Sequence, residues 1–390
     1  MRLAGLHCLL LFAGSSAAHF GDGPHPVEPA EILTWSAEQR VQGFPRYAEI
    51  FPTRAIRAGD RVLPLSLAPT DLSSVSYLVD GEPFTVDDFV TIGHVAGMIV
   101  MRDHQIVFER YALGHSVRSP WIGYSIAKSV VSLLYGAAIA DGYIRSVDDP
   151  LTDYLPRLGG GAYEGVTIKQ LLQMSSGVAW REDYEDPTAD VTQSPNDQLA
   201  LIDYMQALPR AAEPGSVFNY STGETNLAGS VLRAAIGNNL ATYLTHKIWQ
   251  PAGMQANGNW LIGKPGGWEW GGCCISATLR DLARLGLFVL GDGVAADGTR
   301  MLPNGWIRAS TTPSSNHASY GYFWWLLDEG AFAAIGIFGQ MLWIDPKSNM
   351  VIAIQSAWPS ASSRRLATHR AAMIAAIQQR LASQTPTSTK

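Results

Sequence analysis

The stretch GYSIAKSVVSLLYGAAIADGYI, at residues 123–144, contains the clearest helix pattern of the chain and a pair of potentially reactive side chains. From Ile126 onward its apolar residues recur every three or four positions, which is the spacing of one buried helix face. The pair Asp141-Gly142 is a typical helix stop. The stretch therefore predicts a helix over residues 125–140.

Ser125 and Lys128 stand three residues apart at the start of this predicted helix. That spacing places both on one helix face, with Cβ atoms about 5–6 Å apart. A hydroxyl becomes a nucleophile only when a base removes its proton, and a lysine can be that base when desolvation or a neighbouring cation lowers its pKa. A helix start also exposes unpaired N–H groups that stabilise an oxyanion. The pair is a candidate nucleophile and base, although a surface lysine after a helix-start serine has the same spacing.

Two further segments offer what such a site would need. Tyr220 follows the turn-like segment PGSVFN at 214–219, and a tyrosine beside a lysine can carry a proton between nucleophile and leaving group. The Gly-rich strand IGIFGQ at 335–340 allows a close backbone approach and supplies a second N–H for an oxyanion hole.

The rest of the chain surrounds these segments with strand patterns at both ends and short helical patterns between. Apolar runs at Gly97–Met101 and Gln105–Tyr111 predict a hairpin, and a long helix is expected near the C-terminus. Further strands are predicted at 322–327, 333–344 and 350–356. This order predicts the α/β (α+β) class: an antiparallel sheet flanked by helices, built from both chain ends, with an inserted, mainly helical domain.

The predicted domain boundaries follow from the same pattern. We expect an N-terminal arm at 19–85, a discontinuous α/β domain at 86–144 and 273–383, a mainly helical domain at 145–272, and a disordered tail at 384–390. Residues 1–18 are typical of a signal peptide: a positive residue, an apolar run and small residues ending at Ala18. The alternative is an N-terminal helix. The apolar run is shorter than the about 20 residues that span a bilayer, so we expect an exported protein, periplasmic or secreted, without stable membrane insertion.

Composition narrows the function classes. The 390 residues are 47% hydrophobic and 16% charged, which excludes a disordered chain. The net charge is −6 and no basic run occurs, so nucleic acid is not an expected partner. Cys273 and Cys274 are adjacent, and side chains of neighbours diverge along an extended backbone, so we expect two small, half-buried loop residues rather than a disulfide. The oligomeric state cannot be inferred from the sequence.

Five stretches resemble the serine β-lactamase and penicillin-binding-protein superfamily, and they occur along the chain in the same order as in that family. The similarity is closest to the class C-like branch, with the family VIII carboxylesterases and the 6-aminohexanoate-dimer hydrolases. The resembling stretches are residues 123–144, VTIKQLLQMSSGVAW at 166–180, PGSVFNYSTGETNLAG at 214–229, GGCCISATLRDLARLG at 271–286, and YGYFWW at 320–325 with GIFGQMLWIDP at 336–346. The resemblance implies a β-lactamase/transpeptidase-like fold and a serine hydrolase that uses no metal or organic cofactor.

The resemblance also implies roles for individual residues. Ser125 is similar to the acylated nucleophile of the family, Lys128 to its general base and Tyr220 to its proton-relay tyrosine. The backbone N–H groups of Ser125 and Ile337 would form the oxyanion hole. Tyr184 resembles a tyrosine that approaches the substrate amide in the nylon-oligomer hydrolases. Trp270 and Gly336 are further expected substrate contacts.

Two departures from the family pattern point to the substrate. The strand facing the nucleophile has Ala334-Ile335-Gly336, or in another register Phe338-Gly339-Gln340, where β-lactamases and peptidases carry a basic residue. Without that cation, an anionic substrate group would sit unpaired in a partly apolar site. Thr222 stands where an asparagine usually follows the tyrosine. We therefore predict a small-molecule substrate, either a small ester or a linear amide such as a 6-aminohexanoate oligomer.

Other functions stay open at this point. One is a β-lactamase or a D-Ala-D-Ala-type peptidase, and another is a relative that binds its ligand without turnover. A third is an α/β-hydrolase, because GYSIA at 123–127 is close to a nucleophile elbow, with His246, His317 or His369 as the base. That elbow requires a buried strand directly before the serine, and the segment 116–122 has an arginine, two serines and a proline where that strand should be.

Overall fold

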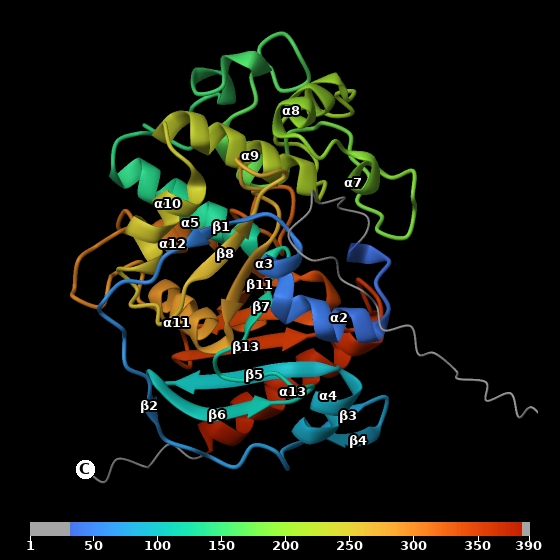
Figure 1. Cartoon of the computed structure of the whole chain (residues 1–390), viewed down its shortest axis with the longest axis vertical. Helices are drawn as coiled ribbons and strands as arrows, with labels where there is room; N and C mark the ends of the chain where they lie inside the picture. Colours follow the sequence, from blue (N-terminus) through green and yellow to red (C-terminus); the bar gives the residue numbers. More distant parts are fainter. Residues whose placement is uncertain (1–31, 384–390) are drawn as a thin grey trace, which may run out of the picture.

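The computed structural model, which describes residues 32–383, contains a seven-stranded central sheet (Figure 1). All neighbouring strands are antiparallel except the last pair, β6 and β2. The strands are, in spatial order, β10 (Trp325–Leu326), β11 (Phe332–Gly336), β12 (Gln340–Asp345), β13 (Met350–Ser356), β5 (Val95–Arg102), β6 (Gln105–Tyr111) and β2 (Ser66–Leu67). Strands from opposite ends of the chain thus meet at β13 and β5, as the sequence predicted.

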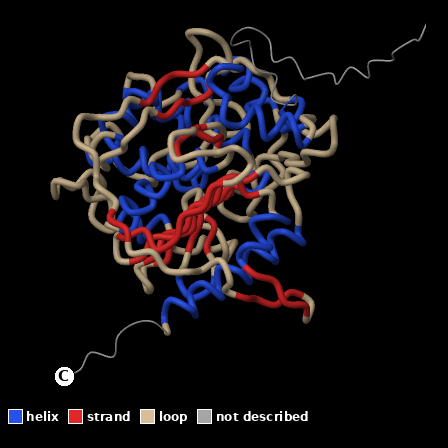
Figure 2. The backbone as a smooth tube through the Cα atoms, turned by 60° about the horizontal axis from the view of Figure 1, so that its bottom comes forward, coloured by secondary structure: helices blue, strands red, loops and turns tan. Residues whose placement is uncertain are grey.

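Helices cover both faces of this sheet (Figure 2). Alternate residues of β5 point to opposite sides: Ile99 joins the core beneath α11 (Leu279–Leu290), and Met98 joins the core beneath α13 (Arg364–Ala382). The helix α4 (Val86–Ile92) packs beside α13. Burial on both faces explains why β5 reads as a nearly continuous apolar run.

A smaller sheet joins the N-terminal part of the described chain to the rest. Its order is β1 (Thr53–Ile56), β8 (Gly258–Leu261), β9 (Ile275–Thr278) and β7 (Pro120–Ile122). A separate hairpin consists of β3 (Ser76–Val79) and β4 (Glu82–Thr85). Short helices lie before β1 in the described part of the chain, among them α2 (Ala37–Gly43), η1 (Phe44–Arg46) and α3 (Tyr47–Ile50). The sequence predicted only an irregular arm here, because helices of three to seven residues are too short to show a period.

The nucleophile helix lies between the central sheet and the helical region. This helix, α5 (Ile126–Ala140), contacts α9 on one side and β11 on the other. Figure 1 shows α7 to α10 together beyond it. The remaining helices are η2 (Leu151–Asp153), η3 (Pro156–Leu158), α6 (Ile168–Leu172), α7 (Asp190–Gln193), α8 (Gln198–Ala207), α9 (Thr222–Ile236), α10 (Leu240–Leu244), η4 (Thr245–Trp249), α12 (Trp306–Ser310) and η5 (Asp328–Gly330).

Two strand predictions near the C-terminus were wrong. The run 333–344 is two antiparallel strands, β11 and β12, joined by the short turn η6 (Ile337–Gly339). Phe338 and Gly339 adopt positive φ values of 58° and 90°, which reverse the chain inside an unbroken apolar run. The run 322–327 contributes only the two residues of β10, since Phe323 also has a positive φ.

The predicted signal peptide and tail, residues 1–18 and 384–390, lie outside the described residues. Within residues 32–383, no helix is both long enough and apolar enough to cross a bilayer. The division into an arm and two domains stays a prediction from the sequence.

Candidate active site

Ser125 is placed at the start of α5 by a sharp change of backbone direction. The strand β7 ends at Ile122, and Gly123 still donates its N–H to the carbonyl of Ile275 on the neighbouring strand, at 2.8 Å. Tyr124 then adopts a positive φ of 47°, which turns the chain into the helix. Ser125 is the N-cap residue and lines a cavity at this end of the helix.

Lys128 lies one helical turn further on and is almost completely buried, with 2% of its surface exposed. Its Nζ is 3.0 Å from Ser125 Oγ, 3.0 Å from Thr222 Oγ1 and 2.9 Å from the carbonyl oxygen of Gly272. Burial lowers the pKa of the ammonium to about 8, against the opposing effect of the nearby Glu182 carboxylate. Near neutral pH, a useful fraction of Lys128 is therefore the free amine, which can accept the serine proton.

Tyr220 completes the predicted group of three. Its ring centre lies 5.3 Å from Lys128 Nζ, and its hydroxyl interacts with the Ser125 hydroxyl. The ring stacks on Trp325, with centres 5.5 Å apart and an interplanar angle of 23°. Burial and then the Glu182 carboxylate raise the pKa of the phenol above its usual value, so the hydroxyl keeps its proton at neutral pH. The three predicted catalytic residues thus lie together, although Tyr220 is 92 residues beyond Lys128 in the sequence.

Glu182 is a site residue that the sequence reasoning did not single out. Its carboxylate accepts a hydrogen bond from Tyr184 Oη at 2.5 Å and from the Thr222 N–H at 2.9 Å. It also accepts from the Thr222 hydroxyl and from the indole N–H of Trp180. Glu182 is connected to Lys128 through Thr222, and its charge raises the pKa of Lys128.

Hydrogen bonds to the Glu182 carboxylate hold Thr222 and Tyr184 in position. Thr222 stands where the family pattern has an asparagine, and its hydroxyl still contacts the lysine. Tyr184 lines the cavity, as expected for a substrate contact, but its hydroxyl is engaged by Glu182. The acidic run 181–186 was the available signal: Glu182 is half-buried, whereas its neighbours Asp183 and Glu185 are exposed.

The loop before β9 brings Gly272 to the lysine. Gly271 and Gly272 have no side chain because helix α9 passes very close: a Cβ on Gly271 would lie 2.2 Å from the carbonyl oxygen of Thr225. Asn226 on that helix accepts the N–H of Gly272 through its Oδ1 at 2.8 Å. This bond holds the Gly272 carbonyl against Lys128.

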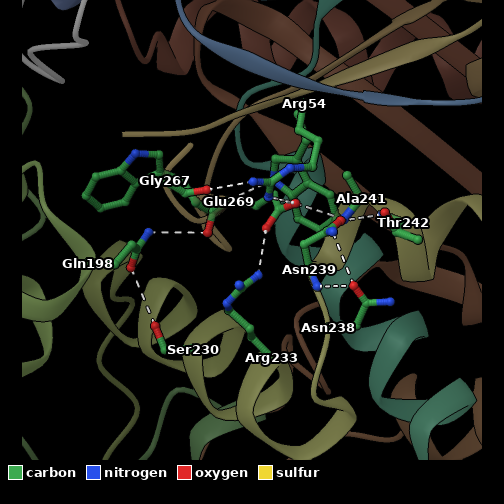
Figure 3. A network of polar contacts seen from close by, with 12 residues as sticks. Arg54, Gln198, Ser230, Arg233, Asn238, Asn239, Ala241, Thr242, Gly267 and Glu269 are labelled. Carbon is green, nitrogen blue, oxygen red and sulfur yellow. Dashed lines mark hydrogen bonds and ion pairs between the residues drawn. The ribbon is translucent and has the colours of Figure 1, made fainter. Parts of the chain in front are cut away.

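The buried carboxylate of Glu269 anchors the loop before β9 through a network of polar contacts (Figure 3). Glu269 has a fully buried side chain and lies between Arg54, whose Nη1 is 2.5 Å away, and Arg233, at 3.9 Å. Its Oε1 also accepts the Ala241 N–H at 3.1 Å, and its backbone oxygen accepts Gln198 Nε2 at 3.2 Å. Arg54 belongs to β1 and Arg233 to α9, so the pair ties the loop to both regions.

The two cysteines follow this loop. Contrary to our expectation, the structure joins Cys273 and Cys274 as a disulfide. The expectation assumed an extended backbone, whereas residues 271–273 form a turn and a bend. Cys273 lines the cavity and Cys274 is fully buried.

On the opposite side, Ile337 lines the cavity at the end of β11, near the nucleophile. This position matches the register in which the Ile337 N–H is the second oxyanion donor. In the alternative register Phe338-Gly339-Gln340 would stand at this position, but none of the three lines the cavity, and the Gln340 side chain donates to the carbonyl of Ser356 at 2.6 Å. Gly336 is not part of the cavity wall: a Cβ there would lie 2.4 Å from the carbonyl oxygen of Gly123, so glycine permits the close approach of strand and nucleophile turn.

The cavity that contains Ser125 has about 680 Å³ of empty space and is partly open to solvent. Trp270 forms part of its wall, as expected, and is otherwise buried. The side chains that surround it are apolar or uncharged: Ile32, Leu33, Tyr124, Ser125, Tyr184, Val191, Ser194, Thr222, Asn226, Leu261, Trp270, Gly272, Cys273 and Ile337.

The histidines that an α/β-hydrolase would need do not line this cavity. His369 contacts Tyr77 Oη, at 3.2 Å, on the α13 side of the central sheet, and His317 packs on Phe218. The antiparallel sheet also differs from the α/β-hydrolase arrangement. Among residues 32–383, no group of three or more His, Cys, Asp or Glu is arranged to hold a metal ion.

Comparisons with known proteins agree with this geometry. The family model described as Beta-lactamase matches residues 85–376. The 6-aminohexanoate-dimer hydrolase of Paenarthrobacter ureafaciens is 27% identical over 376 residues, covering 88% of this chain and 93% of that protein.

Solved structures share the fold. A Bacillus anthracis protein described as a candidate 6-aminohexanoate-dimer hydrolase superposes with a TM-score of 0.79 at 22% identity, covering 88% of this chain and 94% of its own. EstCE1, described as a hydrolase with promiscuous acyltransferase activity, gives a TM-score of 0.59 at 15% identity, covering 75% and 96%. Because the family match extends over most of the sequence, the chain belongs to the Beta-lactamase family and is a serine hydrolase of the β-lactamase and penicillin-binding-protein superfamily.

Proposed function

We propose that this hydrolase cleaves small esters or linear amides through an acyl-enzyme on Ser125. One observation carries the assignment: a buried amine, with its pKa lowered to about 8, lies 3.0 Å from the Ser125 hydroxyl. A lysine in that state is a base suited to activating a serine at neutral pH.

The reaction follows from the positions of the side chains. Neutral Lys128 accepts the hydroxyl proton while Ser125 Oγ forms a bond to the substrate carbonyl carbon. The carbonyl oxygen becomes an oxyanion that the N–H groups of Ser125 and Ile337 stabilise. Tyr220 gives its proton to the departing alkoxide or amine and takes one from Lys128, so the bond to the leaving group breaks. A water molecule then attacks the acyl carbon and gives one proton to Lys128 or Tyr220. The bond between the acyl carbon and Ser125 Oγ breaks, that proton passes to Ser125 Oγ, and the carboxylic acid is released.

The surroundings of the site favour a substrate without charge near the scissile bond. Neither β11 nor η6 contains a basic residue, and none of the cavity residues is charged. Esters are the first candidate substrate class, because a good leaving group departs even when the proton donor is not ideally placed. Linear amides come second, supported by the name of the Paenarthrobacter relative.

The alternative substrates are less well supported. A β-lactam or a D-Ala-D-Ala peptide carries a carboxylate that would find no cationic partner in the cavity wall. A relative that only binds its ligand would not need a buried lysine beside a serine, because burial of that amine is costly and only the reaction uses it.

Hydrolysis of p-nitrophenyl butyrate by the parent protein and by Lys128→Ala tests the proposal. We expect turnover in the parent and a loss of about 10²–10⁴-fold in kcat/KM in the variant, the usual contribution of a general base. Lys169→Ala is the matched control, because Lys169 is an exposed lysine on α6. Near-normal activity of Lys128→Ala would contradict the mechanism.

We also propose that the protein acts after export. The support is the pattern of residues 1–18: a positive residue, an apolar run and small residues before a cleavage point near Ala18. The test is the N-terminal sequence of protein recovered from the periplasm or medium. An intact Met1 on protein retained in the cytoplasm would contradict it.

A further inference from the structure

The cavity wall includes residues from far outside the family motifs. Ile32 and Leu33 lie before α2, more than 90 residues ahead of Ser125, and both line the cavity of the nucleophile. Ile32 is 3% exposed, and Leu33 is half-buried. The N-terminal segment is therefore part of the site as well as a link between sheets.

This segment is held firmly against the body. The Trp35 N–H donates to the Ile32 carbonyl at 3.4 Å, and the Trp35 ring stacks on Phe51 with centres 5.8 Å apart. Arg40 donates to the Pro359 carbonyl at 2.9 Å and lies over the Phe338 ring.

A single aromatic side chain then connects the segment to both sides of the site. Phe44 packs edge-on against Tyr124, which precedes the nucleophile, and lies 5.8 Å from the ring of Phe338, which follows Ile337. The wall formed by Ile32 and Leu33 is thus fixed relative to the two expected oxyanion donors.

The chemistry of the wall is apolar. Ile32 and Leu33 share the cavity with Val191, Leu261 and Trp270, and the polar residues of the lining carry no charge. A chain of methylene groups packed there loses contact with water at no electrostatic cost. A carboxylate packed there would lose its hydration without gaining an ionic partner.

We propose that Ile32 and Leu33 form the acyl subsite of the enzyme and make it selective for linear aliphatic acyl groups over acyl groups that end in a carboxylate. The inference rests on the proposed function, because it names the class of acyl group that Ser125 receives. It makes the N-terminal segment a determinant of specificity.

The test compares p-nitrophenyl acetate, butyrate and hexanoate with the parent protein and with the Ile32→Ala and Leu33→Ala variants. In the parent, kcat/KM should rise by about fourfold for each methylene that the subsite buries. Either variant should flatten this rise, so that the loss of kcat/KM relative to the parent is larger for hexanoate than for butyrate and smallest for acetate. Leu78→Ala is the matched control, since Leu78 is 65% exposed on β3, and it should keep the parent profile.

A charged acyl group gives the second readout. The p-nitrophenyl monoester of adipate has six acyl carbons like the hexanoate ester but ends in a carboxylate, and we expect it to react at least about 100-fold more slowly. Equal rates would overturn the proposal.

The outcomes separate the two claims. A parent that hydrolyses acetate with no dependence on chain length overturns the acyl subsite and leaves the proposed function standing. Chain-length dependence that survives both variants shows that other residues form the subsite. If the variants lose acetate hydrolysis as well, with near-ultraviolet circular dichroism unchanged, the segment supports catalysis in general and the specificity claim fails. A parent inactive on all three esters removes the acyl-subsite claim and the ester part of the proposed function, and leaves linear amides as the substrate class.

Discussion

Lys128 gives the site its pH dependence. Only the neutral amine can accept the serine proton, and burial lowers its pKa to about 8. Below that pH the active fraction falls tenfold per unit. We therefore predict that kcat/KM for a neutral ester rises with pH and levels off above an apparent pKa near 8. A flat profile between pH 6 and pH 9 would contradict Lys128 as the base.

Glu182 adjusts the pKa of Lys128. Its carboxylate raises the pKa of Lys128, so Glu182→Gln, which keeps the side-chain size, should move the rising limb of the kcat/KM profile to lower pH. Loss of packing alone would reduce the rate without moving the limb. Glu185→Gln, an exposed residue of the same acidic run, is the control and should leave the profile in place. An unmoved limb in Glu182→Gln would mean that this charge does not act on the lysine.

The sequence predicted the contact between Ser125 and Lys128, because their spacing on one helix determines it. It did not predict the role of Glu182, because that role depends on which side chains enclose the carboxylate in the folded protein. Ser125 and Lys128 are one turn apart on a single helix, so their proximity follows from the helix itself. The distinction between Glu182 and its exposed neighbours depends on Trp180, Tyr184 and Thr222 closing around one carboxylate. Such an enclosure is a property of the folded chain.

At the level of elements, the loop before β9 depends on a buried ion-pair network. Removal of a buried partner leaves the remaining charges uncompensated. Glu269→Ala should therefore destabilise the protein by about 3 kcal/mol, at the lower end of the usual effect because Arg54 and Arg233 keep side-chain exposures of 26% and 28%. The shift in the urea unfolding midpoint measures this loss.

An exposed ion pair provides the comparison for Glu269. Glu49 pairs with Arg46 at 2.7 Å, but both side chains are more than half exposed. Such pairs contribute about 0–1 kcal/mol, so Glu49→Ala should leave the midpoint nearly unchanged. Equal midpoints for Glu269→Ala and Glu49→Ala would show that the Glu269 network does not anchor the loop.

Elements with a long repeat were predictable, and turns within apolar runs were not. The hairpin β5–β6 shows two apolar runs on either side of a short polar turn, and the helix α5 shows a helical period. The turn η6 carries Ile337-Phe338-Gly339, in which only the glycine signals a reversal. The positive φ of Phe338 is held by tertiary contacts with Phe44 and Tyr124, which local sequence does not report.

For the whole molecule, the pairing of β13 with β5 makes the central sheet depend on both ends of the chain. The helix α13 covers one face through buried residues that include Met373, Ile377 and Leu381. Deletion of residues 364–383 would expose that apolar face, and we predict aggregation on expression. A soluble truncated protein with the parent near-ultraviolet circular dichroism would contradict this account.

The overall architecture was predictable because strand patterns at both ends and helices between them allow few arrangements. The contribution of the N-terminal segment to the cavity was not, since the contacts of Ile32 and Leu33 join residues distant in sequence and have no periodic signature.

The most direct test of the account is the identity of the acylated residue. The parent protein is mixed with p-nitrophenyl butyrate, quenched in acid during turnover and digested, and the peptide that gains a butyryl group is sequenced by mass spectrometry. We predict the modification on Ser125 in the parent and its loss in Ser125→Ala. A butyryl group on another residue, carried equally by the parent and by Ser125→Ala while hydrolysis continues, would contradict it.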